Sequence, residues 1–247
     1  MKLSITPFHS SPRSICANRY MIAHAQQVTL LSSIGMRIQS IQDHGSLILI
    51  ADGLAGLAND RIAAECALEL FHKFYTLTEP IYEISYLKDF VYNAHHEIRN
   101  AITEKNMPLM GCSIVLIWEF QDQMMWLSLG DAYLLHQHQD KCVQINHRHT
   151  LAEFARRQWI AETAQEQLAQ AWFFGSKIPN NTNVVVLTDE FDFGYLNVQR
   201  FDSLLLCNND FGKENPNWEM NLKLETLKQT FSRNPNRDWT AVHINIF

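Results

Sequence analysis

The order in which two kinds of apolar periodicity follow one another along the chain most constrains its fold. Residues 18–50 contain short apolar runs separated by turn residues, a pattern typical of strands. Apolar residues then recur at helical spacing from about 59 to 75 and again over about 84–105. Strand-like runs return between residues 112 and 147. Because strands and helices are grouped rather than strictly alternating, we expect an α+β fold in which antiparallel sheet packs against helices.

The remainder of the chain continues in short segments of both types. Apolar spacing predicts helices at about 150–158, 162–172 and 219–231, and strands at 183–190 and 240–247. The stretch 195–220 is polar and irregular enough to be a flap, although the sequence does not tell which loop controls access to a site. Neither a repeat nor a linker-like change of composition divides residues 1–247, so we expect a single domain.

Charge and cysteine content exclude several classes of function. A formal net charge of -6 leaves no basic excess for nucleic acid or for a membrane surface. No apolar run has the length of a signal-peptide core or of a membrane-spanning helix. The 5 cysteines are widely spaced and form no CxxC pair, which favours free thiols in a reducing compartment. We therefore expect a cytoplasmic protein.

Acidic residues stand where apolar strands end or begin. Asp52 follows SLILIA, Asp131 follows MMWLSLG, and Asp189 follows NVVVLT, while Asp238 precedes the last predicted strand. Carboxylates that converge at strand ends provide the oxygen ligands that Mg²⁺ and Mn²⁺ prefer. Each of these residues could equally be an ordinary turn or cap residue, and spacing alone leaves both interpretations open.

Six segments together resemble the type 2C metal-dependent Ser/Thr phosphatase family (PPM), in its bacterial form. They occur in the family's order along nearly the whole chain: ADGLAG (51–56), MGCSIVLI (110–117), LSLGDAYLLHQ (127–137), INHRHTLAE (145–153), VVVLTDEFDFG (184–194) and RDWTAVHINIF (237–247). The resemblance implies one type 2C phosphatase-like domain. It also implies a four-layer α-β-β-α sandwich, with two antiparallel sheets flanked by helices.

The same resemblance implies a metal site for two ions of Mn²⁺ or Mg²⁺, or for three. Asp52 corresponds to the carboxylate that bridges the first two metals, and Gly53 to the residue whose carbonyl completes the first site. Asp189 and Asp238 correspond to ligands of the second metal, and Asp131 to a ligand of a third.

The N-terminal signature of the family implies a phosphate-binding arginine. Arg13 stands five residues before Asn18, where the family has an Asp, and Arg13 would grip the substrate phosphate with its forked guanidinium. The resemblance thus makes Asp52 and Arg13 the catalytic residues. Gln42-Asp43 is a rival position for this signature, although it leaves too little chain before Asp52 for a hairpin.

The sequence departs from the family pattern around this site. Besides Asn18, the preceding acidic residue is replaced by Ala17, the Gly of SDG by Glu190, and the Asn of the DN pair by Trp239. Asp192 lies one position before the place where the family has a further carboxylate. Glu190 could supply a compensating carboxylate.

Two functions follow from the resemblance and its departures. The first is a metal-dependent protein phosphatase that hydrolyses phosphoserine or phosphothreonine by a metal-activated water bridging two divalent cations. Its partner would be a phosphorylated protein, the substrate of a Ser/Thr kinase. The alternative is a pseudophosphatase, a regulatory module that binds a phosphoprotein without turnover.

Histidine pairs give weaker signals. His147 and His149 could be a metal pair on one face of a strand, or a surface turn. His136 and His138 alternate on a predicted hairpin strand and are expected to be exposed.

Overall fold

Two antiparallel sheets form the centre of the protein. The computed structural model describes residues 1–10, 18–32, 35–53, 60–77, 81–93, 111–147, 192–214 and 222–247. Sheet A has five strands in the order β1-β12-β11-β8-β9, and sheet B has seven in the order β10-β7-β6-β5-β2-β3-β4. The strands of sheet A are β1 (Leu3–Ser10), β8 (Tyr133–His138), β9 (Lys141–Gln144), β11 (Ser203–Cys207) and β12 (Trp239–Ile246). Those of sheet B are β2 (Asn18–His24), β3 (Gln27–Ser32), β4 (Gly35–Ser40), β5 (Ser46–Gly53), β6 (Cys112–Phe120), β7 (Gln123–Leu129) and β10 (Asp192–Leu196).

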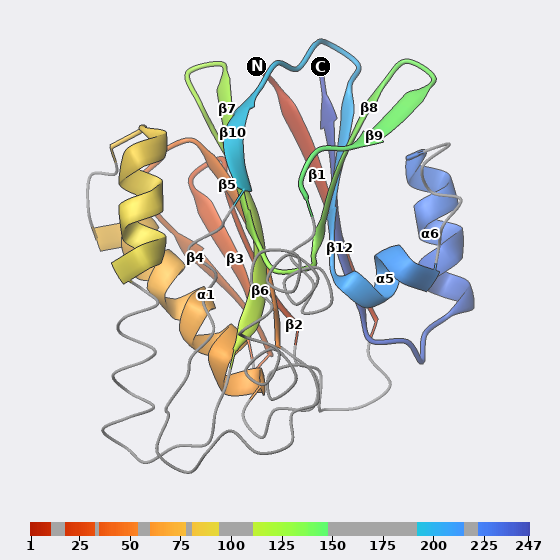
Figure 1. Ribbon diagram of the computed structural model, residues 1–247, viewed down its shortest axis with the longest axis horizontal. Coiled ribbons are helices and arrows are strands. Elements are labelled where there is room, and N and C mark those ends of the chain that lie inside the picture. Colours follow the sequence, from red (N-terminus) through yellow and green to blue (C-terminus); the bar gives the residue numbers. More distant parts are fainter. Residues whose placement is uncertain are drawn as a thin grey trace, which may run out of the picture.

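The sheets pack face to face and carry helices on their outer faces (Figure 1). Helix α1 (Asp60–Leu77) and the helical residues 84–93 cover sheet B. Helices α5 (Asn209–Glu214) and α6 (Leu224–Arg233) cover sheet A. This is the predicted α+β sandwich with two flanked antiparallel sheets. No helix in the described part of the chain is long and apolar enough to span a membrane.

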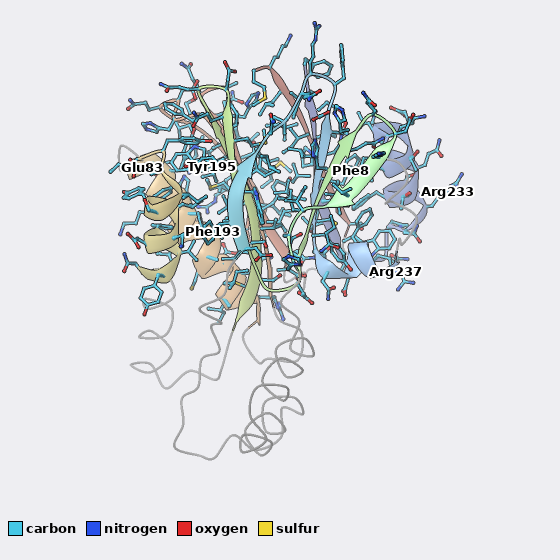
Figure 2. All side chains as sticks on the ribbon, turned by 45° about the horizontal axis from the view of Figure 1, so that its top comes forward. Phe8, Glu83, Phe193, Tyr195, Arg233 and Arg237 are labelled. Atoms are coloured by element: carbon cyan, nitrogen blue, oxygen red, sulfur yellow. The ribbon has the colours of Figure 1, made fainter. Side chains whose placement is uncertain are left out.

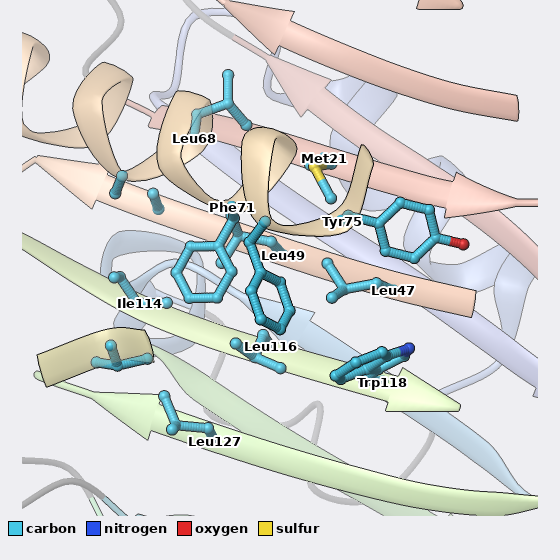
Figure 3. Packing of buried hydrophobic residues seen from close by; sticks show 14 of the residues in the cluster. Met21, Leu47, Leu49, Leu68, Phe71, Tyr75, Ile114, Leu116, Trp118 and Leu127 are labelled. Carbon is cyan, nitrogen blue, oxygen red and sulfur yellow. The ribbon is translucent and has the colours of Figure 1, made fainter. Parts of the chain in front are cut away.

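The continuous apolar run of β5 is explained by its position in the middle of sheet B. Alternate side chains point to opposite faces of a strand, so a strand covered on both faces needs apolar residues at every position. Leu47 and Leu49 pack under the outer helices, whereas Ile48 and Ile50 pack between the sheets. On the helix side, Phe71 of α1 lies over the same layer of apolar side chains (Figure 3).

The candidate flap at 195–220 is largely regular structure in its described part, residues 195–214. This stretch contains the end of β10, the whole of β11 and helix α5. The run SLLLC forms β11, which is buried between β8 and β12 at the centre of sheet A. Phe193 and Tyr195 of β10 face the helical residues 84–93 (Figure 2), and Lys88 Nζ lies 4.1 Å from the centroid of the Phe193 ring.

The other predicted elements have different outcomes. The strands predicted within 18–50, 112–147 and 240–247 are present, and the helix predicted at 219–231 begins later, at Leu224. Strand β1 was not predicted. The helices predicted at about 150–158 and 162–172 and the strand at 183–190 lie outside the described residues.

Candidate active site

Asp52 lies at the end of β5 in sheet B. This end of the sandwich, which also holds Asn18 and Asp238, is the mouth between the two sheets. In the register of sheet B it is opposite Asn18 on one side and Ser113 on the other. Asp52 continues the alternation of Ile48 and Ile50, which pack between the sheets, so it belongs to the inter-sheet face. Its position is fixed by central strands paired on both sides.

Asp238 is held at the same mouth by two asparagines. The Asn18 side-chain amide donates to the Asp238 carboxylate Oδ1 at 3.1 Å and to its backbone carbonyl at 3.2 Å. The Asn208 amide donates to the same carbonyl at 3.0 Å, and Asn208 Oδ1 accepts from the Thr240 backbone N–H at 3.1 Å. These bonds join strand ends of both sheets.

The buried carboxyl group of Asp52 is influenced by the charges of three other carboxylates. Burial raises the pKa of Asp52, and the negative charges of Asp131, Asp210 and Asp238 raise it further, to about 8. A hydrogen bond from the Asn208 side chain acts in the opposite direction. A cation bound beside Asp52 would stabilise its ionised form and would displace the proton that it carries below this pKa.

The turn that precedes Asp131 requires glycine. Gly130 has a φ of +88°, in the left-handed region. A Cβ atom built there would lie 2.6 Å from Ser113 Cβ. The close approach of this turn to β6 places Asp131 within electrostatic reach of Asp52.

The Ser113 hydroxyl is a buried polar group beside Asp52. Ser113 is 2% exposed, and its Oγ has no hydrogen-bond partner within the segments that the structure describes. Because an unsatisfied buried hydroxyl is costly, it indicates room for a polar ligand or water at this point.

Of the residues expected at the site, Asn18, Asp52, Asp131 and Asp238 come together at the mouth. Gly53 is the next residue of β5, opposite Cys112. The pairing of Asn18 with Asp52 supports the N-terminal alignment over its rival, since Asp43 lies in a turn and accepts from the Gly45 N–H.

The remaining predicted site residues lie elsewhere or are not described. Arg13, Ala17, Asp189 and Glu190 lie outside the described residues. Asp192 begins the edge strand β10, where its carboxylate accepts from the His147 backbone N–H at 2.5 Å.

Asn208 and Asp210 are site residues that the sequence reasoning missed. They follow β11, the strand that lies beside β12 in sheet A, so the end of β11 reaches Asp238. The signal was present, because an apolar run (SLLLC) followed by an acidic residue is the same pattern that predicted Asp52. The prediction instead used NVVVLT and Asp189 for such a strand end.

Two other expectations change with the structure. His136 and His138 were expected to be exposed, but both bond the buried Asp202 carboxylate, His136 Nε2 at 2.7 Å and His138 Nδ1 at 2.7 Å. Trp239, which follows Asp238, is buried against Phe211 and Phe231 rather than facing the site. Of the pair His147 and His149, only the first is among the described residues.

The side chains at this site suit a divalent cation that keeps some of its waters. Within the described residues, no three His, Cys, Asp or Glu side chains lie close enough together to hold one ion directly. Mg²⁺, however, is commonly bound through one or two carboxylates and keeps several of its waters. The raised pKa of Asp52 and the unpartnered Ser113 hydroxyl fit such a hydrated cation between the four carboxylates.

Comparison with known proteins identifies the fold. No protein-family model and no curated protein matches the sequence. The structure has the architecture of the bacterial serine/threonine phosphatases. It superposes on the S. agalactiae serine/threonine phosphatase with a TM-score of 0.63 and 17% identity, covering 100% of this chain and 99% of that one.

Two further phosphatase structures give the same result. Serine/threonine phosphatase Stp1 from Staphylococcus aureus has a TM-score of 0.65 at 16% identity, with 100% of this chain and 96% of that one covered. The catalytic domain of PstP, solved in complex with 2 manganese ions, has a TM-score of 0.59 at 14% identity and covers 99% and 97%. The protein therefore has the PPM phosphatase fold along its length.

Proposed function

We propose that this protein is a metal-dependent phosphatase that removes phosphate from phosphoserine or phosphothreonine in a phosphorylated protein. The observation that carries the proposal is the position of Asp52 opposite Asn18, which bonds Asp238, with the charges of Asp131, Asp210 and Asp238 all acting on Asp52. The likeness of fold to proteins that are serine/threonine phosphatases supports the same function. A cytoplasmic location and a Ser/Thr kinase that phosphorylates the substrate belong to this proposal.

The residues divide the work as follows. Asp52, with Asp131, Asp210, Asp238 and the Gly53 carbonyl, would hold Mn²⁺ or Mg²⁺. The bound cation would supply a water of lowered pKa and would offset phosphate charge. Asn18 and Asn208 hold Asp238 in place through the hydrogen bonds that their side-chain amides donate to it. In this proposal Arg13 grips the phosphate oxygens, as the family resemblance implies.

The test is hydrolysis of a phosphoserine peptide with increasing Mn²⁺. We expect phosphate release that depends on the cation and falls by about 10²-fold or more in Asp52→Asn, because Asn cannot compensate the cation's charge. Asp140→Asn, in the turn between β8 and β9, is the matched control with the same chemical change. Activity unchanged in Asp52→Asn would contradict the assignment.

A second function, binding of a phosphoprotein without turnover, is favoured by one observation. The Asn18 amide donates to Asp238 Oδ1, an atom that a cation would otherwise use. Together with the lack of a three-ligand cluster in the described segments, this favours a site that is closed by amides rather than by metal. This function predicts that a phosphopeptide binds more tightly than its unphosphorylated form in the presence of a chelator, and that no phosphate is released with Mn²⁺.

A further inference from the structure

We propose that strand β4 is an association surface, which pairs antiparallel with β4 of a second copy of this chain and joins the two B sheets across a two-fold axis at Ile38. The inference goes beyond the proposed phosphatase function and does not depend on it.

Strand β4 ends sheet B with one edge unpaired. It pairs with β3 on one side, and no strand of the described part of the chain lies on its other side (Figure 1). All its residues except Arg37 are exposed. The backbone N–H and C=O groups along such an edge form a template for another extended chain.

The face of β4 that turns toward sheet A is apolar and uncovered. Met36 lies opposite Leu31 of β3, and Leu31 packs against the core between the sheets. Ile38 has the same parity as Met36, so both side chains belong to the inter-sheet face. They are nonetheless 61% and 62% exposed, so sheet A does not cover them.

The other edge strands carry features that usually prevent pairing between molecules. Strand β1 contains Pro7, and β9 has only 4 residues and begins with Lys141. Strand β10 begins with Asp192 and lies against the helical residues 84–93. Proline, charge, shortness and a covering element each protect an edge. Strand β4 has no proline and no covering element, and its one charged residue, Arg37, lies on the helix-covered face, where it bonds the carboxylate of Glu69.

A second copy of β4 offers a matching strand. Antiparallel pairing places side chains of one face opposite side chains of the same face. With the axis at Ile38, the two Ile38 side chains meet, and Met36 of each copy lies beside them on the apolar face. On the helix-covered face, Arg37 then lies opposite the uncharged Gln39 of the second copy. An axis at Arg37 would instead bring two like charges together, which is unfavourable.

The length of the strand sets the strength of the association. A pair of strands this short buries less than the roughly 1,000 Å² of a stable interface, so the copies should exchange rapidly and associate only at high concentration. Because the pairing is antiparallel, the two mouths lie at opposite ends of the joined sheet, and both stay open.

Sedimentation of the whole protein tests the proposal. We expect the average mass to rise from that of one chain toward that of two as the protein concentration rises from about 10 µM to about 1 mM. Ile38→Lys should abolish this rise, because two like charges would meet at the axis. Val143→Lys is the matched control: Val143 is 51% exposed on edge strand β9, and the same chemical change there should leave the rise intact.

Complementary variants make the test specific to the axis. Ile38→Glu alone should sediment as a single chain, as Ile38→Lys does. An equal mixture of the two variants should associate at least as well as the unaltered protein, since opposite charges then face each other. Loss of folding in a variant would give no such recovery, and circular dichroism checks the fold of each variant separately.

Each of three results overturns the proposal. The first is a single-chain mass for the unaltered protein up to about 1 mM. The second is a mixture of the Lys and Glu variants that stays monomeric. The third is a loss of association in Val143→Lys but not in Ile38→Lys, which assigns the contact to β9. None of these results bears on the phosphatase function, which is judged by Mn²⁺-dependent hydrolysis.

Discussion

At the scale of single residues, the fold raises the pKa of one carboxyl group, that of Asp52. Its pKa is raised from 3.8 to about 8, first by burial and then by three neighbouring carboxylates. A carboxyl group whose folded pKa lies above its unfolded value stabilises the fold fully below the unfolded value. That contribution is lost as the pH rises through the folded pKa.

This gives a prediction for the metal-free protein. The free energy of unfolding should fall between about pH 4 and pH 8, and Asp52→Asn should remove most of that slope because Asn carries no charge. At pH 8 the variant should be more stable than the unaltered protein by roughly 2–4 kcal/mol. Urea unfolding in a chelator at several pH values measures this, and parallel curves for the two proteins would contradict it.

The pKa of Asp202 is shifted in the opposite direction, below its usual value. Burial alone would raise its pKa, but hydrogen bonds from the Gln199 N–H, His136 and His138 prevail and lower it. Its contribution to stability is therefore present above the unfolded value of 3.8 and is lost as the pH falls through the lower, folded pKa.

We predict that Asp202→Ala is destabilised by about 2–4 kcal/mol at pH 7, because it leaves buried donors without their acceptor. Thermal or urea unfolding checks the value. Asp140→Ala is the control, because Asp140 lies in the exposed turn between β8, which carries His136 and His138, and β9. Its free energy of unfolding should differ from that of the unaltered protein by less than about 0.5 kcal/mol.

At the scale of elements, the turn after β7 is constrained in two ways. Gly130 combines a left-handed φ with a backbone packed against Ser113. Gly35 also has a positive φ, +105°, but a Cβ there would meet nothing within 4 Å. A side chain at Gly35 would therefore meet only backbone strain, whereas a side chain at Gly130 would meet both strain and a steric clash.

Gly130→Ala should therefore cost more stability than Gly35→Ala, about 3 kcal/mol or more against about 1 kcal/mol. It should also weaken Mn²⁺ uptake, since Asp131 would move with the turn. Unfolding and calorimetric titration of the two variants provide the comparison. Equal losses of stability would show that the turn relaxes without strain.

The sequence predicted those elements whose apolar pattern is long. The buried run of β5 and the helical stripe of α1 were both identified, and so was the strand that became β12. Strand β1 was missed because it is an edge strand that contains Pro7 and alternates with polar residues. Strand β11 was missed because its four apolar residues, Leu204–Cys207, lie within a polar stretch.

The site was predictable only in part, for a related reason. Asp52, Asp131 and Asp238 adjoin strands that the sequence reveals, so local pattern found them. Asp210 follows a strand that was overlooked.

At the scale of the whole molecule, a cation at the mouth would link both sheets. Asp52 belongs to sheet B, whereas Asp238 and Asp210 adjoin strands of sheet A. A ligand that binds only the folded protein stabilises it by mass action.

We therefore expect Mn²⁺ at 100 times its Kd to raise the free energy of unfolding by about 2.7 kcal/mol, and to have no such effect on Asp52→Asn. Thermal unfolding with and without Mn²⁺ measures it. An equal rise in both proteins would place the ion elsewhere on the molecule.

The single domain expected for residues 1–247 stays a prediction.

The pairing of the first strand with the last has a consequence for biosynthesis. Strand β12 lies between β1 and β11, so β1 cannot join sheet A until residues 239–246 have left the ribosome. Sheet B can form earlier, since all its strands end by Leu196. In the proposed function, the site would therefore be incomplete until Asp238 and the adjoining strand β12 have been synthesised.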